Sequence, residues 1–94
     1  MKIMHKVLAT FTVLNEKGLH TRPSTELVKC ASHFKAKIFL ICRKYRVNAK
    51  SLLGILMIAA NRGTKIQIEA EGVDAKNAVS ALVELAKNKF NIKY

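Results

Sequence analysis

Residues 18–25 read Gly-Leu-His-Thr-Arg-Pro-Ser-Thr, a stretch in which a loop becomes a helix. Pro23 suits a first helical turn because its missing N–H leaves no hydrogen bond unmade there, and Glu26 adds a favourable negative charge close by. The helix is therefore predicted to begin just after His20. The first amides of a helix have no internal partners, so this position favours an anion, and Arg22 adds a full positive charge.

His20 is the candidate nucleophile of this stretch. The unperturbed pKa of a histidine side chain is about 6.5, so the ring is largely neutral near pH 7 and can accept a phosphoryl group directly. The first amides of the helix would stabilise the negative charge of the phosphoryl group. The alternative, from spacing alone, is that His20 is a solvated capping residue without chemistry.

Residues 50–59, Lys-Ser-Leu-Leu-Gly-Ile-Leu-Met-Ile-Ala, form a second informative stretch. Together with residues 18–25 it resembles the HPr family, the histidine-containing phosphocarriers of the bacterial phosphoenolpyruvate-dependent phosphotransferase system. The first stretch is similar to the family's active-site signature, and the second to the segment around its regulatory serine. The similarity extends from about Phe11 to Phe90.

The resemblance implies that His20 accepts a phosphoryl group on Nδ1 from phosphorylated Enzyme I and passes it to a histidine of an Enzyme IIA domain. Thr21 and Arg22 would bind the phosphoryl group. Ser51 would be a regulatory phosphorylation site, with an HPr kinase/phosphorylase as a further implied partner. Such a protein is a phosphorylated intermediate in a transferase relay rather than a stand-alone enzyme. Sugar transport and a purely regulatory role both remain open.

The resemblance also implies a docking surface for Enzyme I and Enzyme IIA on two predicted helices. Its members would be Thr21, Arg22, Thr25, Val28, Lys29, Leu52, Leu53 and Leu56. Adjacent leucines on a helix point about 100° apart, so an ordinary wide core face is the alternative for Leu52 and Leu53.

Hydrophobic periodicity predicts the element order β-α-β-β-α-β-α. Strands are expected over residues 7–14, 37–42, 45–48 and 64–71. Helices are expected over residues 22–34, from a cap at Asn48 or Ser51 to near Gly63, and after an N-cap at Asp74. Strands and helices intermixed in this way favour an α+β fold with helices on one face of an antiparallel sheet. The resemblance sharpens this to an open-faced β-sandwich, a four-stranded sheet of order 1-4-2-3 with three helices.

Strand alternation assigns the two faces of the sheet. With Phe11, Val13, Ile38 and Leu40 pointing inward, the alternation turns Leu14, Phe39 and Ile41 outward. The open face of such a sheet is expected to be more polar than this. A partner or self-association of an otherwise monomeric chain would cover these side chains, and a register bulge is the alternative.

Length and composition predict one domain over residues 1–94, with residues 1–6 as a frayed N-terminus. Half of the residues are hydrophobic, yet no apolar run approaches the roughly 20 residues that cross a bilayer. Residues 1–6 lack the apolar segment of a secretory signal, so we expect a cytoplasmic protein without membrane insertion. Cys30 and Cys42 are expected to be reduced and mostly buried.

No cofactor or metal site is predicted. The two cysteines lie far apart without a CxxC motif, and the histidines lack the spacing of known ligand sets. His5 falls in the predicted frayed segment, and His33 lies near the end of the first helix, where a partly charged ring suits the helix dipole. We interpret both as structural.

The net charge departs from the family pattern. Seventeen Lys and Arg against six Asp and Glu give +11, whereas HPr proteins are commonly near neutral or acidic. Such a field favours acidic partners and speeds their encounter. A basic nucleic-acid-binding module is the alternative, but the lysines are spread over the whole chain and the few aromatics lie in apolar strand positions. We therefore expect no nucleic-acid partner.

Overall fold

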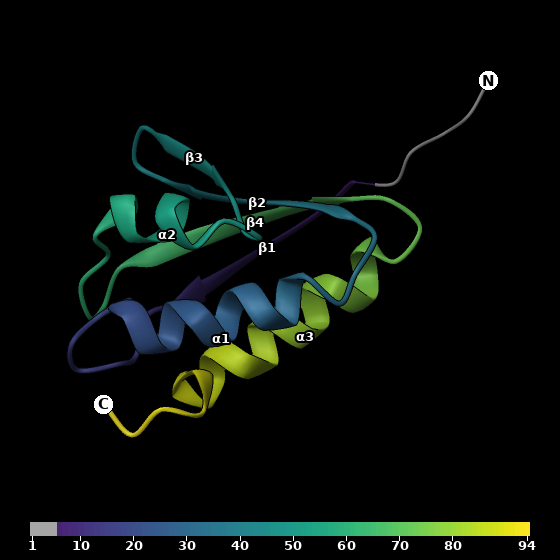
Figure 1. Ribbon diagram of the computed structural model, residues 1–94. Coiled ribbons are helices and arrows are strands. Elements are labelled where there is room, and N and C mark those ends of the chain that lie inside the picture. Colours follow the sequence, from purple (N-terminus) through teal and green to yellow (C-terminus); the bar gives the residue numbers. More distant parts are fainter. Residues whose placement is uncertain (1–5) are drawn as a thin grey trace.

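A computed structural model describes residues 6–94 as a four-stranded antiparallel sheet with three α-helices (Figure 1). The elements are β1 (Lys6–Thr12), α1 (Thr21–Ala31), β2 (Lys37–Cys42), β3 (Tyr45–Asn48), α2 (Leu52–Ile58), β4 (Lys65–Glu71), α3 (Ala75–Lys87) and a 3-10 turn, η1 (Lys89–Asn91). The strand order is β1-β4-β2-β3. The predicted α+β class, element order and sheet order are confirmed.

The core lies between the sheet and the helices, with α1 and α3 side by side (Figure 1). The strands contribute alternate residues, so Phe11, Ile38 and Leu40 are buried as predicted. The buried residues of α3 recur every three or four positions, namely Ala75, Ala78, Val79, Leu82 and Ala86. Val83 and Leu85 are half-buried and pack against the core at the margin of this face.

The second helix is shorter than predicted. It ends at Ile58 rather than near Gly63, because Ala59 adopts a left-handed conformation (φ 51°) and its N–H donates to the carbonyl oxygen of Leu56. The next residue, Ala60, then accepts a hydrogen bond from the amide of Leu19, at 2.9 Å. The end of α2 is thereby tied to the loop that precedes α1.

Other predicted boundaries were also wrong. The first strand ends at Thr12 rather than Leu14. The first helix ends at Ala31 rather than Phe34, because the amides of His33 and Phe34 bond to carbonyls only three residues back. β1 begins at Lys6, so the predicted frayed segment does not include this residue. Residues 1–5, and with them the prediction for His5, lie outside the described part of the chain.

Asp74 occupies the N-cap position of α3 as predicted, but its side chain makes no capping bond among residues 6–94. Instead the carboxylate accepts hydrogen bonds from the amides of Lys35 and Ala36, each at 2.8 Å. The hydrogen bond from the Lys35 amide is the largest cause of a lowered pKa of Asp74; desolvation opposes it, and the bond from the Ala36 amide adds to the lowering. Asp74 therefore joins the start of α3 to the segment that enters β2.

The strand β2 carries two of the three apolar side chains that were predicted to point outward, and both Phe39 and Ile41 are half-buried. Leu14 is exposed but lies after the end of β1 at Thr12, where it lines a hollow with Val83 and Lys87 of α3, so its assignment to the open face by strand alternation was wrong. The Arg46 guanidinium lies 3.9 Å from the centroid of the Phe39 ring and bonds to Glu69 at 2.5 Å. Arg46 thus partly covers Phe39 within the chain, and self-association through this face stays a prediction.

Candidate functional site

His20 is the N-cap residue of α1. Its backbone is extended (φ −76°, ψ −173°), and its carbonyl oxygen accepts from the amide of Ser24 at 3.1 Å. The imidazole is half-buried and makes no capping hydrogen bond within residues 6–94. His20 thus occupies the capping position without capping through its side chain, and the ring is available for other contacts.

The loop that carries His20 is fixed from both sides. Gly18 has a φ of +69°, and a Cβ at this position would clash with the carbonyl oxygen of Ala60. Leu19 is buried, its amide donates to Ala60, and its carbonyl accepts from the buried hydroxyl of Ser24 at 3.0 Å. The position of His20 is thus set by backbone contacts that are protected from water.

Tyr94 lies against His20. The two rings stack with centroids 5.6 Å apart and planes 20° apart, and the His20 Nε2 is 3.3 Å from the Tyr94 backbone oxygen. A backbone oxygen can only accept, so Nε2 carries the hydrogen in this contact and the lone pair of the neutral ring is on Nδ1. The Tyr94 hydroxyl accepts from Nη1 of Arg22 at 2.7 Å.

Sequence reasoning missed Tyr94, because a tyrosine 74 residues from His20 carries no local signal of the contact. Arg22 is exposed, and its guanidinium carbon is 5.7 Å from the Tyr94 ring centroid. Lys17 approaches the same ring, with Nζ 4.8 Å from the centroid. Two full positive charges therefore lie against the Tyr94 ring that stacks on the imidazole, and His20 itself precedes the first amides of α1, a combination suited to an anion.

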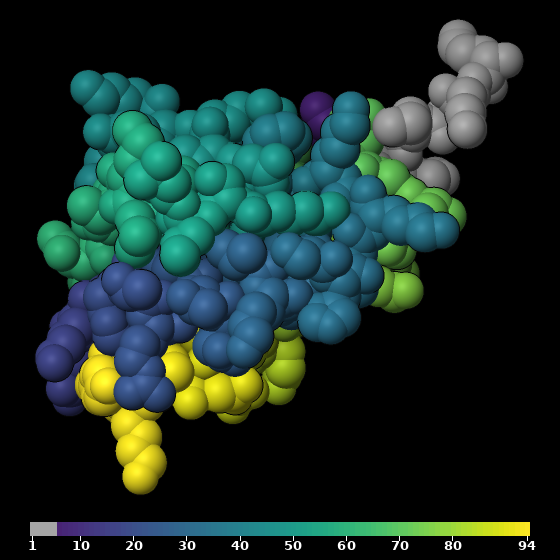
Figure 2. All heavy atoms as spheres, viewed as in Figure 1, coloured from purple at the N-terminus to yellow at the C-terminus, as the bar shows by residue number. Residues whose placement is uncertain are grey.

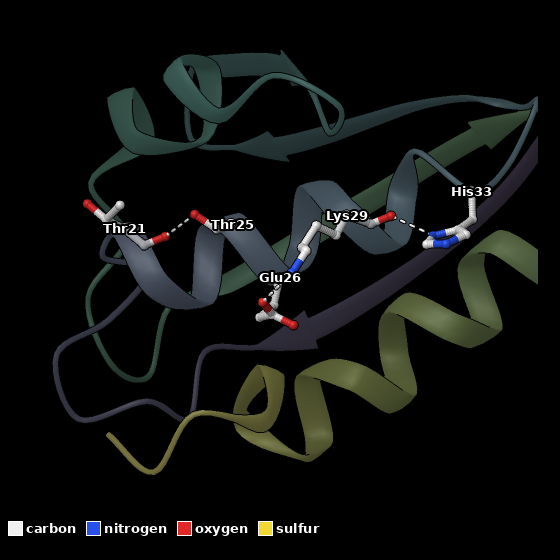
Figure 3. Close-up of polar contacts among 5 residues, drawn as sticks. All are labelled: Thr21, Thr25, Glu26, Lys29 and His33. Atoms are coloured by element: carbon white, nitrogen blue, oxygen red, sulfur yellow. Dashed lines mark hydrogen bonds and ion pairs between the residues drawn. The ribbon is translucent and has the colours of Figure 1, made fainter.

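The exposed side of α1 is held by contacts within the helix (Figure 3). The Thr25 hydroxyl donates to the carbonyl oxygen of Thr21 at 2.8 Å, and Nζ of Lys29 lies 3.5 Å from a carboxylate oxygen of Glu26. His33 bonds through Nδ1 to the Lys29 carbonyl at 2.7 Å, as expected for a structural residue at a helix end. Glu26 was predicted to favour the positive end of the dipole, but it lies beyond the first turn.

The second motif begins α2. Ser51 is the N-cap, and its hydroxyl oxygen accepts from the amide of Gly54 at 3.1 Å, so of the two predicted caps Ser51 is the correct one. Leu53 is 71% exposed, whereas Leu52 and Leu56 are half-buried. Leu53 thus points to solvent, in line with the prediction that the two adjacent leucines diverge.

Met57 is a further exposed apolar residue of α2, at 59% exposure, and sequence reasoning missed it. Its position four residues after Leu53 places both on one side of the helix. α2 packs against α1, and Figure 2 shows the two on one face of the molecule, with the C-terminal residues in yellow on the other side of α1. The predicted α1 members of the docking surface share this region: Thr25 and Val28 are half-buried and Lys29 is exposed.

The cysteines and the remaining polar groups carry no comparable site. Cys42 is buried and Cys30 half-buried, neither forms a disulfide, and burial raises the pKa of the Cys30 thiol, which keeps it protonated. Within residues 6–94, no three His, Cys, Asp or Glu side chains gather in a way that could hold a metal ion. In the same part of the chain, no helix has the length and apolar character needed to cross a membrane.

The chain as a whole is similar to proteins of one known family. The model of the family described as the PTS HPr component phosphorylation site matches residues 7–88. The chain belongs to the HPr family. The predicted resemblance is confirmed, and the chain is a phosphocarrier of the phosphotransferase system.

Relatives and solved structures of the HPr family cover almost the whole chain. Phosphocarrier protein HPr of Treponema pallidum is 43% identical over 84 residues, covering 89% of this chain and 96% of the relative. That of Xylella fastidiosa is 41% identical over 80 residues, covering 85% and 90%. The crystal structure of HPr-C-His from Thermoanaerobacter tengcongensis superposes with a TM-score of 0.88 at 35% identity, covering 94% of this chain and 99% of that one.

Proposed function

We propose that His20 is the residue that carries the phosphoryl group, on Nδ1. The observation that supports this most directly is the contact of Nε2 with the Tyr94 oxygen, since it leaves the lone pair on Nδ1. The nucleophile is at the N-cap of α1, next to the unpaired amides and to the exposed guanidinium of Arg22. Arg22 binds the phosphoryl oxygens, and Thr21, exposed in the first turn, contributes to the same site.

In the proposed reaction, phosphorylated Enzyme I is the donor. The Nδ1 lone pair attacks phosphorus, the phosphorus–nitrogen bond to the histidine of Enzyme I breaks, and that nitrogen recovers the electron pair. A histidine nitrogen of an Enzyme IIA domain then attacks the phosphoryl group on His20 in the same manner. Nε2 keeps its hydrogen throughout, so no proton has to leave the ring before transfer. The carrier acts in the cytoplasm.

The proposed docking surface joins the site to α2. It comprises Thr21, Arg22, Thr25, Val28 and Lys29 on α1, with Leu52, Leu53, Leu56 and Met57 on α2. Exposed apolar residues surrounded by positive charge suit a partner with an apolar centre and an acidic rim. The net charge of +11 would speed encounter with such acidic surfaces at low salt.

The experiment is incubation with phosphoenolpyruvate and purified Enzyme I, followed by measurement of protein mass and of acid lability. His20→Ala should gain no acid-labile phosphate and should keep its circular dichroism spectrum, since His20 is outside the buried core. His33→Ala is the matched control and should be phosphorylated normally, because His33 is an exposed residue after α1. An acid-labile phosphate on His20→Ala would show that another histidine is the acceptor.

We also propose that Ser51 is a regulatory phosphorylation site, with HPr kinase/phosphorylase as the modifying enzyme. A phosphate adds about −1.5 to −2 charge at a helix N-terminus, which the helix dipole tolerates. The same charge is next to Leu52 and Leu53, where an acidic partner would be repelled.

Two variants separate regulation by Ser51 from capping by Ser51. Ser51→Ala removes the bond to the Gly54 amide and should cost about 1 kcal/mol of stability without slowing transfer. Ser51→Asp keeps a capping oxygen and should retain the melting temperature while slowing transfer from Enzyme I. Equal transfer rates in the two variants would leave Ser51 as a structural cap.

A further inference from the structure

The segment after α3 follows an unusual path to the site. Lys89, Phe90 and Asn91 have φ values of 54°, 56° and 61°, so three successive residues without a glycine adopt the left-handed region. Such a conformation is costly for residues with a side chain, and it persists where surrounding contacts hold it. The turn directs the chain back towards the loop before α1, and the C-terminal segment ends near that loop (Figure 1).

Two buried contacts hold this turn. Phe90 is fully buried and meets Phe11 edge to face, with ring centroids 5.9 Å apart. The fully buried Asn15 donates through Nδ2 to the carbonyl oxygen of Lys89 at 2.9 Å. Asn15 is in the same loop as His20. The contacts that fix the turn therefore also fix the tail relative to the site.

At the end of this path Tyr94 makes three kinds of contact with one site. Its ring stacks on the His20 imidazole, its backbone oxygen accepts from Nε2, and its hydroxyl accepts from Arg22. The lone pair of Nδ1 lies in the plane of the imidazole, so stacking on the ring face leaves it open. The guanidinium of Arg22, in contrast, is already engaged by a neutral hydroxyl.

We propose that Tyr94 is a positioning residue of phosphoryl transfer, whose hydroxyl engages Arg22 in the resting site and yields it to the phosphoryl group. This rests on the proposed function of His20 as the acceptor. A phosphoryl oxygen makes a stronger, charge-assisted bond to a guanidinium than a phenol does, so Arg22 changes partner once His20 is phosphorylated. No covalent bond of Tyr94 is made or broken.

The change of partner of Arg22 affects how readily phosphorylated His20 donates its phosphoryl group. A contact present only in the unphosphorylated site stabilises that state relative to the phosphorylated one. The bond between Arg22 and the Tyr94 hydroxyl therefore favours release of the phosphoryl group to the next protein. Tyr94 thus makes phosphorylated His20 a better phosphoryl donor to the next protein, and makes unphosphorylated His20 a slightly poorer phosphoryl acceptor from Enzyme I.

The test measures the equilibrium between phosphorylated Enzyme I and this chain. Tyr94→Phe keeps the ring and removes the hydroxyl, and should shift the equilibrium towards the phosphorylated chain by roughly two- to fivefold, the range for one exposed hydrogen bond. Tyr94→Ala should shift it in the same direction. Tyr45→Phe, at the chain's other tyrosine on β3, is the matched control and should leave the equilibrium unchanged.

Nitrogen-15 NMR of the Arg22 guanidinium adds a measurement that would not change if Tyr94 had only a structural role. In the native chain the guanidinium signals of Arg22 should change on phosphorylation, and in unphosphorylated Tyr94→Phe they should already differ from native. An unchanged or opposite equilibrium in both Tyr94 variants would overturn the proposal. If instead the native chain takes up no acid-labile phosphate, the assignment of His20 fails first, and the two failures are thereby distinguished.

Discussion

Replacement of Phe90 by alanine should loosen the C-terminal turn and destabilise the whole domain. Phe90 is fully buried, and a buried Phe→Ala change typically costs about 3–5 kcal/mol. The left-handed conformation of Lys89 and Phe90 costs roughly 2–4 kcal/mol in total, at about 1–2 kcal/mol per residue. The two quantities are similar, so burial of the ring is large enough to offset the strain of the turn, to which the bond from Asn15 to Lys89 adds.

Without the Phe90 ring the turn should relax to a less strained conformation, which recovers part of the free energy that the left-handed residues cost. The net loss is then expected to be about 2–3 kcal/mol, below the usual range for this substitution. Since a small domain has about 5–15 kcal/mol of stability, the variant should remain folded in buffer. Its melting temperature should fall by about 8 °C or more, at about 4–8 °C for each kcal/mol.

Thermal and urea unfolding followed by circular dichroism measure this loss. Ile38→Ala, a fully buried residue of β2, is the control and should be destabilised by about 2–5 kcal/mol. Only Phe90→Ala should also change the ring signals of His20 in NMR spectra, since only that variant frees Tyr94. A loss below about 1 kcal/mol, or native His20 signals in Phe90→Ala, would refute the reasoning.

Three further predictions concern other parts of the chain. Asp74→Asn should be less stable than the native protein at pH 7, because a carboxyl with a lowered folded-state pKa contributes stability that is fully present above its unfolded pKa of about 3.9. The difference should shrink below that pH and disappear once pH has fallen through the folded-state pKa, and urea titrations at pH 7 and at a series of lower pH values test this. Gly18→Ala should lower the melting temperature markedly, because the new Cβ meets the Ala60 carbonyl at a positive φ, whereas a normal melting curve would contradict that crowding. Leu53→Ser should weaken binding to Enzyme I in a calorimetric titration while leaving stability within about 0.5 kcal/mol, since this side chain is mostly exposed.

Elements whose residues repeat at a regular spacing could be predicted from the sequence. Alternation around Phe11 and Ile38 identified buried strand faces, and the spacing after Asp74 identified the apolar side of α3. The ends of the helices were harder to predict from the sequence. No glycine or proline marks the left-handed residue Ala59, so the end of α2 depends on a tertiary contact rather than on local sequence.

Some residues of the candidate site could likewise be predicted from the sequence and others could not. Residues near His20 in the chain, such as Arg22, were identifiable because a helix start has a local signature. Tyr94 was not, because its contact with the site needs the turn at residues 89–91, which is held by the burial of Phe90 and the bond from Asn15. Local sequence patterns do not show whether the packing of distant residues is strong enough to hold a strained turn.

The order of the strands also determines when the site can form during synthesis. β1 pairs with β4, from Lys6 opposite Glu71 to Thr12 opposite Lys65, so the first strand has no partner until most of the chain has been made. Contacts between such distant segments slow folding relative to local ones. His20 would emerge from the ribosome early, yet its contact with Tyr94 comes 74 residues later. A growing chain that has not yet reached Tyr94 would display the histidine without the arrangement around it, so the complete site should form only after β4 has paired with β1 and Tyr94 has been added.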